Sequence, residues 1–379
     1  MPQKGDSSQD SAFKNWMNAE LVKKISSHIR HHYPDFNSKK FEELSKKLHA
    51  LELKARTRLI AQNLQEHLPA DYSKALKILL LAAEKPKSAS SALKGFDLWP
   101  FTEFIQLHGL QNAEESLEAL TVLTQKFTSE FAVRPFLIHH TDLSLQYLND
   151  LTDHPVHHVR RWVSEGTRPR LPWGEQLPHF IKDPTPTLKL LEKLKYDDEL
   201  YVRKSVANHL NDISKDNPEV TIKTLTRWKK EAPKQHQDKI DWITRHALRG
   251  LIKKGNPKAL KLIGVNTDMN VKIRGFKVDK KSIKVGDKIH FEFEIESKHK
   301  GMAVIDYVIH YRKARGESGK VFKLTTKNLK PNEWVHIKKS HSFKPVTTRV
   351  LYPGLHHVEI LANGKSLGKI PFTLRKVPA

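Results

Sequence analysis

The sequence predicts a mainly α-helical chain that ends in a smaller β domain. Three observations carry this prediction. Apolar residues recur at spacings of three and four from residue 12 to residue 270, apolar and polar residues alternate after Asn270, and part of the helical region repeats itself. The first spacing is that of one helix face, and the alternation is that of strands with one buried face.

The repeat identifies the kind of helical region. Val159 and Val202 are 43 positions apart, and the same interval joins five further pairs of like residues. These pairs are Leu145 and Leu188, Leu148 and Leu191, Leu151 and Leu194, Arg160 and Arg203, and Val163 and Val206. A helix pair that recurs every 40 to 47 residues or so is typical of HEAT-like units, which stack into a solenoid with a concave face.

The region after Asn270 predicts short strands. Ile289, Phe291, Phe293 and Ile295 alternate with polar residues, and turn sequences such as VGD, RGESG, YPG and ANGK separate the apolar runs. About seven such strands indicate an immunoglobulin-like β-sandwich. We therefore expect a disordered N-terminus at residues 1–11, a HEAT-like helical repeat domain at 12–267 and an immunoglobulin-like β-sandwich at 268–379.

Composition limits the function classes. The 379 residues contain no cysteine, which excludes disulfides, thiolate nucleophiles and cysteine zinc sites. The longest clean apolar run, Ile78 to Ala83, is far shorter than the roughly 20 residues of a membrane span. The first ten residues lack the pattern of a secretory signal. We expect a cytoplasmic protein that acts as a monomer and has no membrane partner.

The charge points to a polyanionic partner. The net charge is +24, and residues 271–379 contribute +15 of it, from 24 Lys and Arg against 9 Asp and Glu. Nucleic acid is the first expectation for such an excess. A charge that only keeps a small domain soluble is the alternative.

The densest functional signal is VRRWVSEGTRPRLPW, residues 159–173. Glu165 lies at the carboxyl end of a predicted helix that stops at Gly166, where a carboxylate is disfavoured by about 0.3–1 kcal/mol. The loop that follows carries two arginines and two prolines and ends at Trp173. Such a segment can hold a nucleotide. The alternative is that Glu165 pairs with Arg161 one helical turn earlier and that Trp173 packs in the core.

Two further acids join this signal. Glu130 lies in FTSEFAVRPF, and Asp212 lies on the repeat helix that follows the one with Glu165. Stacked helices of a solenoid place such positions on one wall, so the three carboxylates can meet. Carboxylates repel DNA phosphates, but they stabilise the oxocarbenium-like sugar of glycosidic cleavage, and one of them can position the attacking water.

The runs FTSEFAVRPF, HVRRWVSEGTRPRLPW and YVRKSVANHLNDISKDNP resemble the AlkC branch of the AlkC/AlkD DNA alkylation repair glycosylases. The resemblance covers about residues 12–265, and the tail resembles the immunoglobulin-like domain of some members. It implies a bacterial, nucleoid-associated protein whose helical domain is catalytic and whose sandwich binds DNA. The implied activity is that of a monofunctional enzyme of base excision repair that removes 3-methyladenine and 3-methylcytosine from alkylated double-stranded DNA.

The resemblance also assigns roles to residues. By motif position, Glu130, Glu165 and Asp212 are the active-site acids, Trp173 is the aromatic residue beside the lesion, and Arg161 contacts the lesion or the backbone. We expect DNA contacts from five further cations, namely Arg160, Arg168, Arg170, Lys182 and Arg203.

One alternative function stays open, and a metal site is set aside. A noncatalytic HEAT-repeat scaffold that binds nucleic acid or protein is the alternative function, because fold alone does not select an activity. The 22 histidines form no HExxH pattern or comparable ligand set. We therefore expect no metal and no cofactor.

Overall fold

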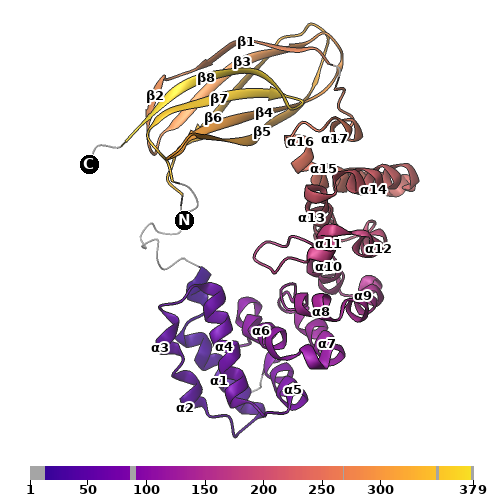
Figure 1. Cartoon of the computed structure of the whole chain (residues 1–379), viewed down its shortest axis with the longest axis vertical. Coiled ribbons are helices and arrows are strands. Elements are labelled where there is room, and N and C mark those ends of the chain that lie inside the picture. The colour runs from indigo at the N-terminus through magenta and orange to yellow at the C-terminus, as the bar shows by residue number, and fades with distance from the viewer. Residues whose placement is uncertain (1–12, 86–90, 268, 347–349, 377–379) are drawn as a thin grey trace. The chain divides into compact units, whose positions relative to one another are not determined.

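The computed structural model describes residues 13–85, 91–267, 269–346 and 350–376 (Figure 1). The predicted N-terminal segment 1–11 lies outside these ranges. Contacts between Cα atoms divide the chain into two units: the helical unit, which extends to Asp216, and the C-terminal unit, which begins at Asn217. The domain limits expected from the sequence, at 267 and 268, remain a prediction.

The helical unit confirms the helical prediction (Figure 1). Its helices are α1 (Ala19–His32), α2 (Ser38–Glu42), α3 (Ser45–Leu48), α4 (Leu53–His67), α5 (Tyr72–Ala83), α6 (Trp99–His108), α7 (Ala113–Thr124), α8 (Arg134–His139), α9 (Thr141–Asp150), α10 (His157–Gly166), α11 (Pro178–Lys182), α12 (Thr185–Leu194) and α13 (Leu200–Asp216). Short 3-10 turns lie at Phe13–Trp16, Gly95–Leu98, Leu110–Asn112 and Leu151–Asp153.

The internal repeat corresponds to two helix pairs. The pair α9 and α10 matches the pair α12 and α13, and the starts of α10 at His157 and α13 at Leu200 differ by the same 43 positions as the repeat. Val159 and Val202 are both fully buried. The repeated valines therefore mark equivalent core positions, and α10 packs directly against α13.

The C-terminal unit begins with helices and ends in strands. The helices are α14 (Pro218–Glu231), α15 (Gln237–Ala247), α16 (Arg249–Lys253) and α17 (Pro257–Leu262), with a 3-10 turn at Lys234–His236. The strands are β1 (Val271–Val278), β2 (Ser282–Lys284), β3 (Lys288–Ser297), β4 (Gly301–Arg312), β5 (Glu317–Leu329), β6 (Val335–Ser342), β7 (Gly354–Ala362) and β8 (Lys365–Arg375). The described residues thus form one strand more than the sequence estimate of about seven.

The strands form two sheets that enclose one apolar core. The order is β1-β3-β6 in one sheet and β2-β8-β7-β4-β5 in the other, and the pairs are antiparallel except β2 with β8. Ile289, Phe291, Phe293 and Ile295, the alternating residues of β3, are all buried in that core. The period-two pattern therefore identified the inner face correctly.

The last helices dock on the outer face of the larger sheet. Leu260 and Val265 form a small apolar cluster with Val304 of β4. Gly255 and Gly364 approach so closely that a Cβ on Gly364 would lie 2.2 Å from the Gly255 Cα. Truncation at residue 270 would expose this cluster, so the strands and these helices belong to one packed body.

Asp306 is buried beside this contact, on the outer face of β4. Its side chain is 3% exposed and borders a cavity of about 120 Å³ that Ile252, Ile263 and Met302 also line. Burial raises the pKa of Asp306 to about 6, although Lys323 and Lys253 partly offset the effect.

Replacing Asp306 by asparagine should raise the free energy of unfolding at pH 8 by about 2–3 kcal/mol and change it little at pH 4. An acid whose pKa is raised by folding stabilises the fold below its unfolded-state pKa, and this contribution is lost as the pH rises through 6. Thermal unfolding of the full chain at the two pH values measures the difference. An equal shift of Tm at the two pH values would show that the charge on Asp306 does not cause the change in stability.

Candidate active site

The three predicted acids come from three separate elements of the helical unit. Glu130 lies in the turn before α8, Glu165 in the last turn of α10, and Asp212 in α13. All three side chains are buried. Two guanidinium groups connect them.

Arg161 joins the first two acids. One of its terminal nitrogens contacts Glu130 and also donates a hydrogen bond of 2.8 Å to the Thr128 hydroxyl. Its other terminal nitrogen lies 3.4 Å from Oε1 of Glu165, one helical turn further along α10. The pairing of Glu165 with Arg161 that the sequence left open as an alternative is therefore present.

Arg168 joins the second acid to the third. Its Nη1 donates to Oε1 of Glu165 at 2.6 Å, and its Nε donates to Oδ2 of Asp212 at 2.7 Å. Lys215 donates to the other oxygen of Asp212 at 2.7 Å. The result is a row of alternating charge, which we call the carboxylate row. Its members are Glu130, Arg161, Glu165, Arg168, Asp212 and Lys215.

Electrostatics keep the middle acid ionised. Burial alone would raise the pKa of Glu165, but Arg161 and Arg168, together with a 2.6 Å hydrogen bond from Ser205, lower that pKa below its usual value. His209 lies close to this acid and is fully buried, and desolvation lowers its pKa to about 3. At neutral pH the site thus contains an anionic Glu165 and an uncharged His209.

The three acids differ in how many of their carboxylate oxygens accept hydrogen bonds. Both oxygens of Glu165 and both oxygens of Asp212 accept hydrogen bonds. Glu130 uses Oε2 for Thr128 and Arg161, whereas its Oε1 accepts no hydrogen bond from the described residues. Glu130 is therefore the acid with an oxygen left to bind water or substrate.

Gly166 allows two of these elements to approach closely. A Cβ at this position would lie 2.7 Å from Cγ1 of Val133, in the segment that follows Glu130. The glycine that ends α10 is thus required for packing, in addition to stopping the helix.

The loop after α10 is held at both ends by Arg134. This guanidinium is fully buried and donates to the backbone carbonyls of Gly166, at 3.0 Å, and Glu175. Trp173 lies between these two points with a φ of 65°, a strained value for a bulky residue, and its side chain is 64% exposed. Its backbone carbonyl accepts a 2.7 Å hydrogen bond from Lys54. The loop therefore presents the indole to solvent, and the alternative that Trp173 packs in the core is wrong.

Comparisons with known proteins agree with this geometry. Residues 272–376 match the family model "Uncharacterised protein YhaZ, C-terminal Ig-like domain". A solved structure, that of Pseudomonas fluorescens alkylpurine DNA glycosylase AlkC bound to DNA containing an abasic site analog, has a sequence 36% identical to this chain. The similarity covers 96% of this chain and 99% of that one, with a TM-score of 0.88. The chain belongs to the AlkC family.

A second member of the same family is the uncharacterised protein YhaZ of Bacillus subtilis strain 168. It is 40% identical over 362 residues, which cover 95% of this chain and 98% of YhaZ. The mainly helical fold and the C-terminal immunoglobulin-like domain expected from the sequence are therefore confirmed. Among the described residues, no helix has both the length and the apolar character needed to cross a membrane.

Five cations of this AlkC-family chain were expected to contact DNA, and they differ in how far protein partners already engage their side chains. Arg160 makes two hydrogen bonds to Asp197, and Arg170 makes two to Asp216. Arg203 donates to two backbone carbonyls, and Arg168 lies in the carboxylate row. Lys182 is exposed and forms no hydrogen bond or ion pair with the described residues. DNA contact by all five remains a prediction, and Lys182 is the most accessible for it.

Sequence reasoning missed the residues that organise the acids. Ser205 and Lys215 on α13, Thr128 and Arg134 all contact members of the site or its loop. Lys215 and Thr128 could have been found, because they lie three and two positions from Asp212 and Glu130. Arg134 lies one helical turn after Glu130 in the sequence, but its contacts to the loop gave no such signal, since its partners are backbone carbonyls 32 and 41 residues away.

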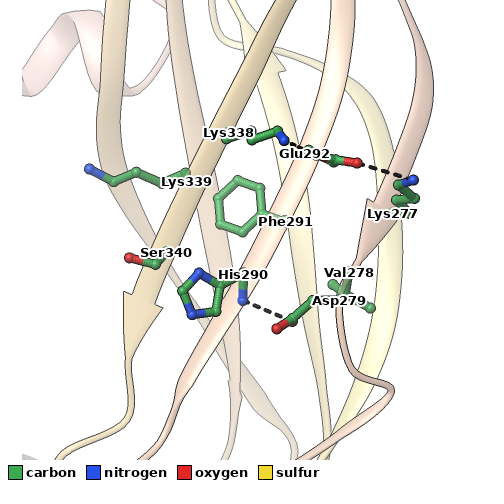
Figure 2. Close-up of a pocket in the computed structure, with 9 residues that line it drawn as sticks. All are labelled: Lys277, Val278, Asp279, His290, Phe291, Glu292, Lys338, Lys339 and Ser340. Carbon is green, nitrogen blue, oxygen red and sulfur yellow. Dashed lines mark hydrogen bonds and ion pairs between the residues drawn. The ribbon is translucent and has the colours of Figure 1, made fainter.

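A second candidate surface lies on the immunoglobulin-like domain of this AlkC-family protein. A groove of about 470 Å³ lies across β1, β3 and β6. Figure 2 shows the side chains that line it. Lys277 and Lys338 converge on Glu292, at 3.0 and 3.2 Å, whereas the ammonium group of Lys339 points away from it. Lys339 has no ion-pair partner among the described residues and is the free cation of this groove.

Proposed function

We propose that this protein is a monofunctional DNA glycosylase of base excision repair. It excises 3-methyladenine and 3-methylcytosine from alkylated duplex DNA without metal or cofactor. The observation that carries the proposal is the carboxylate row, in a chain 36% identical over nearly its whole length to a DNA-bound AlkC. Three buried carboxylates in a chain of net charge +24 are costly for a DNA-binding scaffold, but glycosidic cleavage can use them.

The chemistry requires anions and no proton donor. An N3-methylated base is cationic, so it takes the bonding electrons from C1′ and leaves as a neutral molecule. The sugar becomes an oxocarbenium-like cation, which carboxylates stabilise. Water then adds to C1′ and transfers its proton to a carboxylate or to solvent. Oε1 of Glu130 is the oxygen available to orient this water, while Glu165 and Asp212 stabilise the cation from fixed positions.

Trp173 and Arg161 complete the proposed site. The exposed indole lies on a short loop that Arg134 closes, and a cationic base stacks favourably on such a ring. Arg161 fixes Glu130 and Glu165 in place and would contact the lesion or its backbone from within the carboxylate row.

The function is tested by base release. Duplex DNA that contains 3-methyladenine or 3-methylcytosine is incubated with the full chain in EDTA, and the products are separated by chromatography. We expect the free methylated base and an abasic strand that stays intact until alkali is added. Binding to this DNA without release of either base would exclude the glycosylase and support the noncatalytic scaffold.

Substitution of Lys339 by glutamine should reduce the salt dependence of DNA binding by about 0.9 log units of Kd per log unit of salt, because one phosphate contact is lost. This expectation rests on the proposed DNA-binding role of the sandwich. The matched control is K338Q on the same strand, whose ammonium is already paired with Glu292 and should contribute less. Fluorescence anisotropy from 50 to 200 mM salt measures both slopes. Slopes equal to that of the unmodified protein would place this groove outside the DNA interface.

A further inference from the structure

A pocket of about 350 Å³ lies next to the carboxylate row and has no role in the chemistry described above. It lies in the helical unit, where the segment after α7 meets α10, α13 and the turn at Gly95–Leu98. Its lining consists of Phe96, Thr124, Gln125, Lys126, Phe127, Thr128, His158, Arg161 and Tyr201. We call it the aromatic pocket. Its volume is within the usual range of small-molecule sites, roughly 300–1,000 Å³.

Arg161 belongs to both sites. It contacts Glu130 and Glu165 in the carboxylate row, and its guanidinium carbon lies 5.1 Å from the centre of the Tyr201 ring. Its hydrogen bond to Thr128 ties it to a further lining residue. Occupation of the aromatic pocket therefore acts on the residue that positions two of the proposed acids.

The lining favours flat, unsaturated rings. Phe96 and Phe127 lie with their ring centres 5.3 Å apart, and the rings of His158 and Tyr201 are nearly perpendicular with their centres 5.8 Å apart. Tyr201 is 43% exposed, so one aromatic surface is open to an incoming ring. The side-chain oxygen of Gln125 accepts no hydrogen bond from the described residues and can meet the edge of a ring, whereas the Thr128 hydroxyl is already bonded to Glu130 and Arg161.

Charge selects a neutral ring. None of the described residues that line the pocket carries a carboxylate. Lys126 is paired with Glu84 at 2.7 Å, and desolvation together with His157 and Arg161 lowers the pKa of His158. Arg161 is already paired with Glu130 and Glu165, so the described lining residues offer a cationic methylated base no anion, and the carboxylates lie in the neighbouring row. The lesion and the occupant of this pocket are therefore different bases.

We propose that the aromatic pocket binds an unmodified, neutral nucleobase that leaves the duplex stack when the lesion is engaged. This inference rests on the proposed function and adds a second base site to it. The base can come from the nucleotide opposite the lesion, from a nucleotide flanking it, or from free base in solution. All share the same recognition, which is stacking on Tyr201 and edge hydrogen bonds.

The experiment measures binding and needs no catalysis. Duplexes carry a stable abasic analogue in place of the lesion, and a second abasic position replaces the opposite, the 5′ or the 3′ base. One of these duplexes should bind the full chain about 5- to 100-fold more weakly than the duplex with all neighbouring bases, as expected for one lost stacking contact. Free adenine is also titrated against the complex with the duplex that keeps all neighbouring bases. Displacement of that duplex would show that the pocket takes a free base from solution.

The variant Y201A should remove this difference, because the stacking surface is then absent. L200A is the matched control: Leu200 is the preceding residue, is 49% exposed and does not line the pocket, so the difference should persist. The proposal is overturned if binding is unaffected by removal of any neighbouring base and free adenine does not compete. It is also overturned if Y201A leaves the loss of affinity or the competition unchanged. Base release by the unmodified protein is scored separately, so failure of the glycosylase function is distinguishable.

Discussion

Substitution of Glu130 by glutamine is expected to slow release of 3-methyladenine by about 100- to 1,000-fold, with DNA affinity changed less than about threefold. The magnitude is that of losing one preorganised electrostatic partner of a transition state. Glutamine keeps the size of the side chain and an oxygen for Thr128, but it removes the negative charge shared with Oε1, the oxygen that accepts no hydrogen bond from the described residues. Single-turnover kinetics measures the rate, and titration with a duplex that contains an abasic analogue measures affinity.

The matched control for this variant is E118Q. Glu118 is an exposed acid on α7 that lies outside the carboxylate row, and its substitution should leave both quantities unchanged. A Glu130 variant that releases base at the unmodified rate would remove this residue from the chemistry. Equal losses of rate and DNA affinity would indicate that Glu130 supports the fold or the binding surface instead.

Substitution of Arg168 by methionine is expected to lower the free energy of unfolding by about 3–5 kcal/mol, a fall in Tm of roughly 10 °C. Arg168 is buried between Glu165 and Asp212, and its removal leaves two buried carboxylates short of a counter-charge. The pKa of Glu165 should rise, so the acid limb of base release should move to higher pH. Thermal unfolding followed by circular dichroism and a rate profile below pH 7 check the two effects.

Arg170 provides the control for this experiment on the same loop. It also pairs with a carboxylate of α13, Asp216, but this pair is more exposed, so R170M should lower the free energy of unfolding far less than R168M does. Combining R168M with D212N should restore about 1–3 kcal/mol relative to the sum of the single variants. Strictly additive changes in the free energy of unfolding for R168M and D212N would contradict charge compensation within the carboxylate row. Equal losses of stability for R168M and R170M would contradict it as well.

The fold was largely predictable because its signals are local or periodic. The 43-residue interval located α9 with α10 and α12 with α13, and alternation in β3 identified the sandwich core. The grouping of α14–α17 with the strands was not predicted. It depends on a contact such as that of Leu260 with Val304, which no periodicity within one element encodes.

The acids of the candidate site were predictable from the sequence, whereas most of the side chains that pair with them were not. Three carboxylates were expected to meet, and they do so through arginines. Arg168 was assigned to DNA, because an arginine in a loop offers the same chemistry to a phosphate and to a carboxylate. Its partner Asp212 is 44 residues away, so only the packing of α10 on α13 reveals the choice. The exposure of Trp173 likewise depends on the clamp by Arg134.

The central claim is that side chains acting as anions, with no proton donor, let a cationic base depart. Its most direct test is the single-turnover rate of 3-methyladenine release between pH 5 and pH 9. With the pKa of Glu165 depressed, the rate should stay level across the neutral and alkaline range. A rate that falls tenfold for each pH unit above neutrality would reveal a required acid and contradict the account.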